Sequence, residues 1–351
     1  MGGSALSVPT RRITAQEFAG ITAEIVGMLR AALPGARVAV VPSYRTKPDF
    51  GDIDILVERE AVHAAGGPAL LEDLARNAWF SRASFRNGPV LSVEYRHGDE
   101  PVGCQVDLIT APSAEFRFHL DYLSYNDLGN LIGRVAHRMG FSYGQAGLIY
   151  RVRDGDHVFA DLPLTLTTAA ALRFMGYDPG RFASGFDTLE EIFEYVASSR
   201  YFAPELYLFE NRNHAARTRD RKRKNYRLFL EWLAQGHTPK NKACFAWADR
   251  NDESMVAVER HALLLDARRR FPEFALQLVE VERRLFAARQ AKAKFNGGLV
   301  MEWTGLCGQQ LGALMRRLRE GFASPEAMNA WVNTQEPAAI KAWVEREASK
   351  A

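Results

Sequence analysis

Three aspartates set among apolar residues carry the clearest chemical signal in the sequence. Asp52 and Asp54 lie in the stretch GDIDILV (51–57), which has the residue types of a β-strand. Side chains alternate along a strand, so the two carboxylates share one face, roughly 6–7 Å apart, and the apolar residues can anchor the other face in a core. Two acids on one face of an apolar strand are costly without a positive charge between them, and hard oxygen ligands of this kind suit Mg²⁺.

Asp107 supplies a third carboxylate, again among apolar residues, in the stretch QVDLI (105–109). If this strand lies beside the first, the three acids can hold two ions roughly 3.5–4 Å apart, which is the arrangement for in-line displacement at phosphorus. A pair of alternating aspartates is a weak signal alone, because acids at the end of a strand can also simply face water. The residues upstream strengthen it.

A short polar segment, PSYRTK (42–47), precedes the aspartates. Ser43 can hydrogen-bond a triphosphate, and Arg45 and Lys47 can bind one by charge. The alternative interpretation of this segment is an ordinary polar turn.

Positive charge is concentrated in one segment, NRNHAARTRDRKRKNYR (211–227). It carries eight basic side chains and one acid, a net charge of +7, whereas the rest of the chain carries −4. Such a patch is typical of a polyanion site, because each neutralised phosphate releases counterions. The alternative is a solvated helix face. We assign a nucleic-acid contact to these basic residues: Arg212, Arg217, Arg219, Arg221, Lys222, Arg223 and Lys224.

The pattern of apolar residues predicts the elements that position these groups. Up to about residue 112 it predicts helix, strand, strand, helix, strand and strand, at 15–33, 37–41, 53–57, 69–79, 90–95 and 105–110. Beyond this the chain is mainly helical, with a short hairpin expected around Asp154-Gly155 and helices expected at 126–139, 167–176, 188–198, 220–235, 254–268, 272–293 and 308–320. The fold class predicted is therefore α+β: a mixed sheet with helices, followed by a mainly helical C-terminal region.

Length and composition exclude several classes of protein. The 351 residues are 47% hydrophobic and 25% charged, which argues against a disordered or fibrous chain. No run of 18 apolar residues occurs, and no secretory signal is recognisable. Three widely spaced cysteines, Cys104, Cys244 and Cys307, argue against a disulfide framework or a structural zinc site. We expect a cytoplasmic protein that does not act at a membrane.

The segment PSYRTKPDFGDIDILV resembles the active-site motif of the DNA polymerase beta nucleotidyltransferase superfamily, and is most similar to that of the family X polymerases. The family pattern is approximately G-S-[YF]-R-R-G-K, a short turn, then G-D-[IV]-D-[IV]-L. The segment VDL with Asp107 resembles the family's last acid-bearing strand. The resemblance covers roughly residues 36–180. It implies a palm at 1–112, a nucleotide-binding or thumb region at 113–185 and a helical nucleic-acid-binding domain at 186–351.

The resemblance implies an enzyme that transfers a nucleoside monophosphate from a (d)NTP to the 3′-hydroxyl of a nucleic acid and releases pyrophosphate. Asp52, Asp54 and Asp107 would be the catalytic and metal-binding residues, with two Mg²⁺ ions, or Mn²⁺, as cofactors. The nucleotide would be bound by Ser43, Arg45, Lys47, Gly51 and Ser124.

The sequence departs from the family pattern where the nucleotide and the template would be contacted. The family's first glycine is Pro42 here, which has no N–H to offer a phosphate. The family's Thr-Gly is Leu123-Ser124, and its Asn and Arg fall on Gly129 and Gly133. Asp121 stands where a sugar-facing aromatic residue is usual. These changes favour a transferase with little template dependence and slightly favour RNA or tRNA over DNA as acceptor. The alternative is a non-catalytic nucleic-acid-binding relative.

Overall fold

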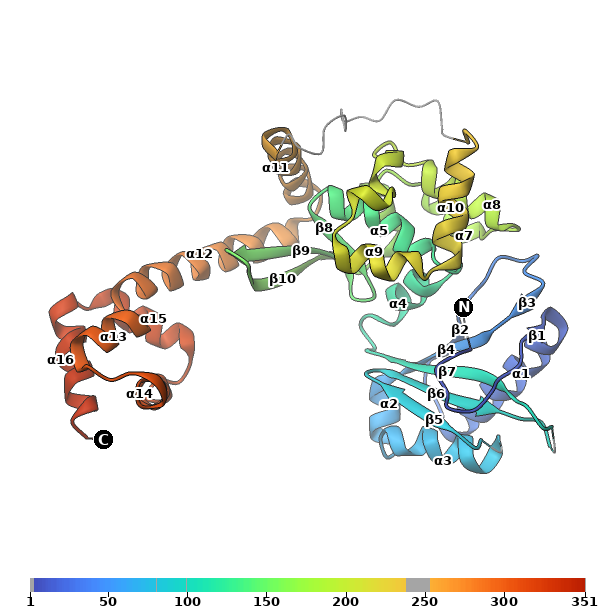
Figure 1. The fold of residues 1–351 in the computed structure, drawn as a ribbon, viewed down its shortest axis with the longest axis horizontal. Coiled ribbons are helices and arrows are strands. Elements are labelled where there is room, and N and C mark those ends of the chain that lie inside the picture. The colour runs from blue at the N-terminus through green and yellow to red at the C-terminus, as the bar shows by residue number, and fades with distance from the viewer. Residues whose placement is uncertain (1–2, 80, 99, 238–252, 351) are drawn as a thin grey trace. The chain divides into compact units, whose positions relative to one another are not determined.

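The computed structural model of the chain describes residues 3–79, 81–98, 100–237 and 253–350, and it divides into two compact units (Figure 1). Unit 1 consists of Met1–Tyr150 and Pro163–Phe271, and unit 2 of Arg151–Leu162 and Pro272–Ala351. The α+β class is confirmed, with a mixed sheet followed by a mainly helical region. The three-part division at 112 and 185 concerns function and stays a prediction.

A five-stranded mixed sheet forms the first part of unit 1. Its strand order is β2-β4-β7-β6-β5, with β4 and β7 parallel and the other neighbours antiparallel. The bounds are Val38–Val40 (β2), Asp52–Glu58 (β4), Ser84–Asn87 (β5), Val90–Tyr95 (β6) and Cys104–Ala111 (β7). The four strands predicted for this region are confirmed. The fifth, β5, is exposed along its whole length, so it has no apolar alternation by which to recognise it.

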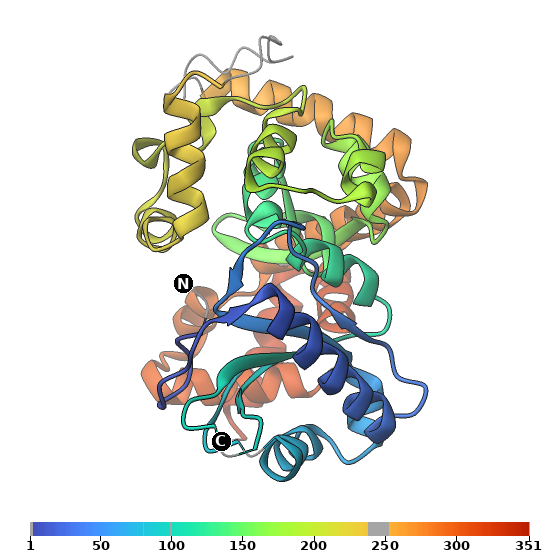
Figure 2. The same cartoon turned by 90° about the vertical axis from the view of Figure 1, so that its right-hand side faces the viewer.

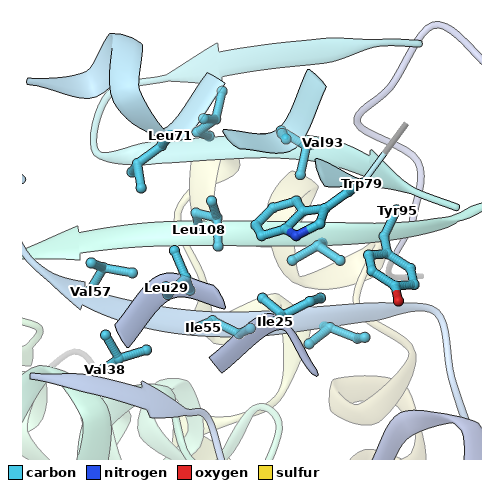
Figure 3. Close-up of a cluster of buried hydrophobic side chains, with 14 of the residues drawn as sticks. Ile25, Leu29, Val38, Ile55, Val57, Leu71, Trp79, Val93, Tyr95 and Leu108 are labelled. Carbon is cyan, nitrogen blue, oxygen red and sulfur yellow. The ribbon is translucent and has the colours of Figure 1, made fainter. Parts of the chain in front are cut away.

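Three helices cover one face of this sheet. They are α1 (Ala15–Ala32), α2 (Arg59–Ala64) and α3 (Pro68–Ala78). Figure 3 shows Ile25 and Leu29 of α1 in one apolar cluster with Ile55 and Val57 of β4. The start of α1 is fixed by a capping box between Thr14 and Glu17.

The opposite face of the sheet is only partly covered. Helix α4 (Phe116–Leu123) packs there against a small cluster that contains Leu56 of β4 and Ile109 of β7. Because side chains alternate along a strand, Asp52 and Asp54 lie on the same face as Leu56, and Asp107 lies on the same face as Ile109. The helix covers the apolar positions of this face, and the acidic positions precede them along both strands.

The rest of unit 1 is mainly helical. Its elements, including the hairpin strands that lead into unit 2, are α5 (Leu128–Arg138), β8 (Phe141–Gly144), β9 (Gly147–Asp154), β10 (His157–Thr165), α6 (Thr168–Phe174), α7 (Pro179–Ser184), α8 (Leu189–Ala197), α9 (His214–Arg221), α10 (Lys224–Ala234) and α11 (Glu253–Arg270), with 3₁₀ turns at Pro204–Leu206 and Phe209–Asn211. The hairpin expected around Asp154-Gly155 is confirmed by β9 and β10. Two short strands, β1 (Ile13–Thr14) and β3 (Asp49–Phe50), pair with each other beside the sheet.

The helix predicted at 220–235 is confirmed from Lys224 onward as α10, but it does not begin at residue 220, because the chain breaks between α9 and α10. Arg223 adopts an extended conformation (φ −86°, ψ 113°) and forms an ion pair with Asp127 of the α4–α5 loop. Asp220 is fully buried and pairs with Arg212 and Arg219. These ion pairs hold the two helices at an angle that continuous apolar spacing does not predict.

Unit 2 has its own apolar core. It contains α12 (Pro272–Lys294), α13 (Gly297–Thr304), α14 (Gly308–Glu320), α15 (Pro325–Thr334) and α16 (Pro337–Ala348). Trp331 and Trp343 pack edge to face against this core. Among the described helices, none combines the length and apolar character that crossing a bilayer requires. Cys104 and Cys307 are free thiols, and Cys244 lies outside the described residues.

Candidate active site

The three aspartates meet on the open face of the sheet. The parallel register of β4 and β7 places Asp54 directly opposite Asp107 and Asp52 opposite Gln105. The antiparallel register of β7 and β6 adds Ser92 opposite Asp107. A row of polar side chains therefore crosses three strands at the level of Asp54, as the sequence predicted for the acids.

Hydrogen bonds orient two of the three carboxylates. Gln105 Nε2 donates to both oxygens of Asp107, at 2.9 and 3.1 Å, and Gln105 Oε1 accepts from the backbone N–H of Ala5 at 2.9 Å. The N–H of Gly3 donates to Asp52 Oδ2 at 3.2 Å. Gly3 has a φ of +83°, and a Cβ there would lie 2.2 Å from the carbonyl oxygen of Gly51. The sequence pattern does not predict that this N-terminal segment reaches the acids.

The electrostatics of the site are dominated by crowded negative charge. Desolvation raises the pKa of Asp54, and the neighbouring charges of Asp52 and Asp107 raise it further. Desolvation also raises the pKa of Asp107, against a hydrogen bond from Ser92. Lys47 lies close enough to act on Asp52 and Asp54, and burial lowers its own pKa. Like-charged carboxylates in this setting favour a cation between them.

Asp52 and Asp54 line a cleft of about 1310 Å³ within unit 1, whereas Asp107, on the neighbouring strand, is not among the residues that line it. One wall comes from the sheet and its loops and includes Ser43, Lys47, Gly51, Asp52 and Asp54. The facing wall comes from α9, α10 and the turn between them, which lie across from the strands in both ribbon views (Figures 1 and 2), and it includes His214, Arg219, Lys222, Arg223 and Lys224. The cleft thus has an acidic wall and a basic wall.

A contact between two loops shapes the acidic wall. Ser43 Oγ donates to Asn126 Oδ1 at 2.8 Å, and the Tyr125 N–H donates to the Pro42 carbonyl at 2.7 Å. Tyr125 and Asn126 both have positive φ angles, 61° and 64°, which is uncommon for residues other than glycine. Although Pro42 offers no N–H to a phosphate, its carbonyl fixes this loop. Asn126 and Asp127 therefore line the cleft, although the sequence did not identify them.

Two residues predicted to bind the nucleotide lie elsewhere. Arg45 pairs with Asp187 and donates to the Ser184 carbonyl, so its guanidinium joins the loop to a later segment instead of facing the cleft. Ser124 is 2% exposed and donates to the Leu120 carbonyl at the end of α4. We therefore do not include these two residues in the cleft.

The basic segment is also divided. Arg212 is buried in its pair with Asp220, and Arg221 stacks on the ring of Phe209 at 5.6 Å. Neither they nor Arg217 line the cleft, whereas the other four predicted residues do. A helix presents its side chains on all sides, so a run of basic residues in sequence cannot all face one ligand.

The departures from the family pattern have local structural reasons. A Cβ at Gly129 would lie 2.2 Å from the Tyr122 carbonyl oxygen, so the close packing of α5 on α4 requires glycine. Asp121 is 7% exposed and accepts a hydrogen bond from Thr168 Oγ1 at 2.6 Å, so it does not face the cleft as a sugar-contacting residue would.

The donor set fits a hard divalent cation, since three carboxylates converge from adjacent strands. In the part of the chain that the structure describes, no three His, Cys, Asp or Glu side chains already form a group able to hold a metal ion. To share a metal ion, the carboxylates of Asp52 and Asp107 would have to rotate away from their hydrogen-bond donors, Gly3 and Gln105. No protein-family model and no curated protein matches the chain, so its function is inferred from the site itself.

Proposed function

We propose that the chain is a divalent-metal-dependent nucleotidyltransferase of the DNA polymerase beta superfamily. The observation that carries the proposal is the register of β4 and β7, which places Asp54 directly opposite Asp107 on the open face of a mixed sheet. Asp52, two residues before Asp54 on the same strand, lies on the same face. The motif around these acids supports the same reaction class. The basic wall opposite them supports an anionic acceptor.

The reaction would join the 3′-oxygen of the acceptor to the α-phosphorus of the nucleotide, and the bond from that phosphorus to the departing pyrophosphate would break. Ser43 and Lys47 would hold the triphosphate, by hydrogen bond and by charge. Asp52 and Asp54 would bind two Mg²⁺ or Mn²⁺ ions, and Asp107 one of them. The ions would stabilise charge on the attacking and leaving oxygens. Asp107 would also accept the proton of the 3′-hydroxyl.

The acceptor we propose is a nucleic acid held by Arg219, Lys222, Arg223 and Lys224. A cleft with this basic wall suits a chain of phosphates better than a small neutral acceptor. The preference for RNA or tRNA over DNA stays a prediction from the sequence, and Asp121, which contributed to it, does not line the cleft.

The test is extension of labelled 3′-ends. Single-stranded DNA, primed DNA, generic RNA and tRNA are offered separately with Mg²⁺ and mixed dNTPs or NTPs. We expect extension of at least one acceptor by the wild type and a loss of at least about a hundredfold in Asp54→Asn. The matched control is Asp73→Asn on α3, an exposed aspartate outside the cleft. Equal rates in wild type and Asp54→Asn would exclude the mechanism.

A non-catalytic nucleic-acid-binding protein is the second candidate. The hydrogen bond from Gly3 to Asp52 favours it, because that bond occupies an oxygen that an ion would need. Thermal melting with ATP in the presence and absence of Mg²⁺ separates the two. An increase in melting temperature that requires both ligands supports the enzyme, and an equal increase without metal supports the binding protein.

A further inference from the structure

A second cavity in unit 1 is lined by basic side chains. Its volume is about 590 Å³, and it lies between the end of α5, the segment that leads into α9, and α11. Its charged or titratable lining residues are Arg134, His137, Arg138, Glu205, Arg212 and Arg260. None of these residues lines the cleft that Asp52 and Asp54 line, so this cavity is a separate site.

Two of the guanidinium groups have no ion-pair partner among the described residues. Arg134 has one hydrogen bond, a long one of 3.4 Å to Asn130 Oδ1, and its buried Nε has no acceptor. Arg260 donates to the backbone carbonyls of Arg138 and His137. These carbonyls accept hydrogen bonds from two of its N–H groups but do not neutralise its charge.

The acids near this cavity already have partners. Asp220 pairs with Arg212 and Arg219, and Glu259 pairs with Arg138. Among the described residues of the lining, Glu205 is the one carboxylate, and it is exposed. The cavity therefore contains more positive charge than its described acids compensate.

The titration of the lining agrees with this excess of charge. Burial and the charge of Arg212 lower the pKa of Arg134 to about 10, although Asp220 acts in the opposite direction. Desolvation lowers the pKa of His137, as do the charges of Arg134, Arg260 and Arg212. Each of these groups would be stabilised in its charged form by an anion.

We propose that this cavity is a phosphate-binding site for a nucleotide, either a phosphodiester of a nucleic-acid strand or the phosphates of a mononucleotide. Arg134 and Arg260 provide guanidinium N–H groups of the kind that binds phosphate oxygens, and Asn213 adds a polar side chain at the start of α9.

The position of α9 favours the strand. Ala215, Thr218 and Arg219 line the cleft, whereas Asn213 and Ala216 line the second cavity, so the helix separates the two. A helix is about 10 Å across, and a nucleic-acid strand rises about 3.4 Å per nucleotide, so roughly three nucleotides would span the width of α9. A strand whose 3′-end lies in the cleft could thus place an upstream phosphate in the cavity. This part of the inference rests on the proposed function, whereas phosphate binding does not.

The test measures binding without metal and without transfer, so it is independent of whether the enzyme reaction occurs. A fluorescent 12-nucleotide RNA is titrated with wild type, Arg134→Gln, Arg134→Lys and the control Arg30→Gln, which changes an exposed arginine on α1. ATP binding is measured with the same variants. We expect Arg134→Gln to weaken RNA binding about tenfold at low salt and to reduce the salt slope by about one, with recovery in Arg134→Lys.

The two arms distinguish the sources of the phosphate. Weakened RNA binding with unchanged ATP binding identifies a strand, and parallel loss of both identifies a mononucleotide. Because Arg134 is partly buried, Ala216→Glu is a second variant that adds a negative charge to the cavity lining and should also weaken binding. If Arg134→Gln and Ala216→Glu both bind RNA and ATP as Arg30→Gln does, the cavity is not a phosphate site.

Discussion

At the scale of single residues, Asp54→Asn should increase stability while it abolishes transfer. Desolvation and the charges of Asp52 and Asp107 raise the pKa of Asp54 to about 8, so at pH 7 the folded protein keeps a proton on this carboxyl that the unfolded chain releases, which costs stability. The substitution keeps the shape of the side chain and removes this cost, so without metal we expect about 1–2 kcal/mol of stabilisation. Denaturant unfolding at pH 7 in EDTA measures it. A variant less stable than wild type would show that Lys47 already compensates the charge of Asp54.

The site could be predicted from the sequence where local alternation decides it. The strand pattern places Asp52 and Asp54 on one face, and the structure does so. The pattern could not reveal the contact of Gly3 with Asp52, which joins residues 49 positions apart. A sequence motif likewise does not show that Asp187 pairs with Arg45.

His119 should make the protein sensitive to mild acid. Its side chain is buried, neither ring nitrogen has a hydrogen-bond partner among the described residues, and burial lowers its pKa to about 4. Between pH 6.5 and pH 4 the unfolded chain binds a proton that the folded protein does not, so stability falls by up to about 3 kcal/mol as the pH falls.

The check is urea unfolding at pH 7.5 and pH 5 for wild type, His119→Leu and a control at the exposed His97. His119→Leu should lose a large part of the difference between the two pH values, and His97→Leu should keep it. An unchanged difference in His119→Leu would assign the acid sensitivity to other groups.

At the scale of elements, the strands of the sheet and the long helices followed from apolar periodicity. The break between α9 and α10 did not, because the ion pair of Arg223 with Asp127 joins residues 96 positions apart. The loop contact of Ser43 with Asn126 likewise joins residues 83 positions apart. Periodicity describes one element at a time, and these features depend on two.

Gly129 and Gly133 on α5 should differ sharply when substituted with alanine. A Cβ at Gly129 would meet the Tyr122 carbonyl oxygen at 2.2 Å, whereas at Gly133 the nearest atom is at 3.5 Å. We expect Gly129→Ala to destabilise by about 2–4 kcal/mol through displacement of α5 from α4. Gly133→Ala should stabilise by up to about 1 kcal/mol, as expected for a helix interior. Thermal melting of the two variants measures the difference. Similar melting temperatures for Gly129→Ala and Gly133→Ala would contradict the packing described.

At the scale of the whole molecule, two units with separate apolar cores should unfold in two steps. Ile55 belongs to a core of unit 1 and Ile340 to the core of unit 2, and both are fully buried. Alanine at either position removes buried volume, which costs about 2–5 kcal/mol. Calorimetry should show each variant lowering one transition and leaving the other in place. One transition that shifts as a whole in both variants would mean that the units unfold together.

The measurement that tests the central claim most directly follows the label of the nucleotide. The acceptor that the extension assay identifies is incubated with Mg²⁺ and its nucleotide, labelled at the α- or the γ-phosphorus, beside the Asp54→Asn variant. Nucleotidyl transfer predicts α-label in the acceptor, γ-label in released pyrophosphate, and neither product from Asp54→Asn. Transfer of the γ-label to the acceptor, or α-label incorporation that survives in Asp54→Asn, would contradict the role assigned to the three aspartates.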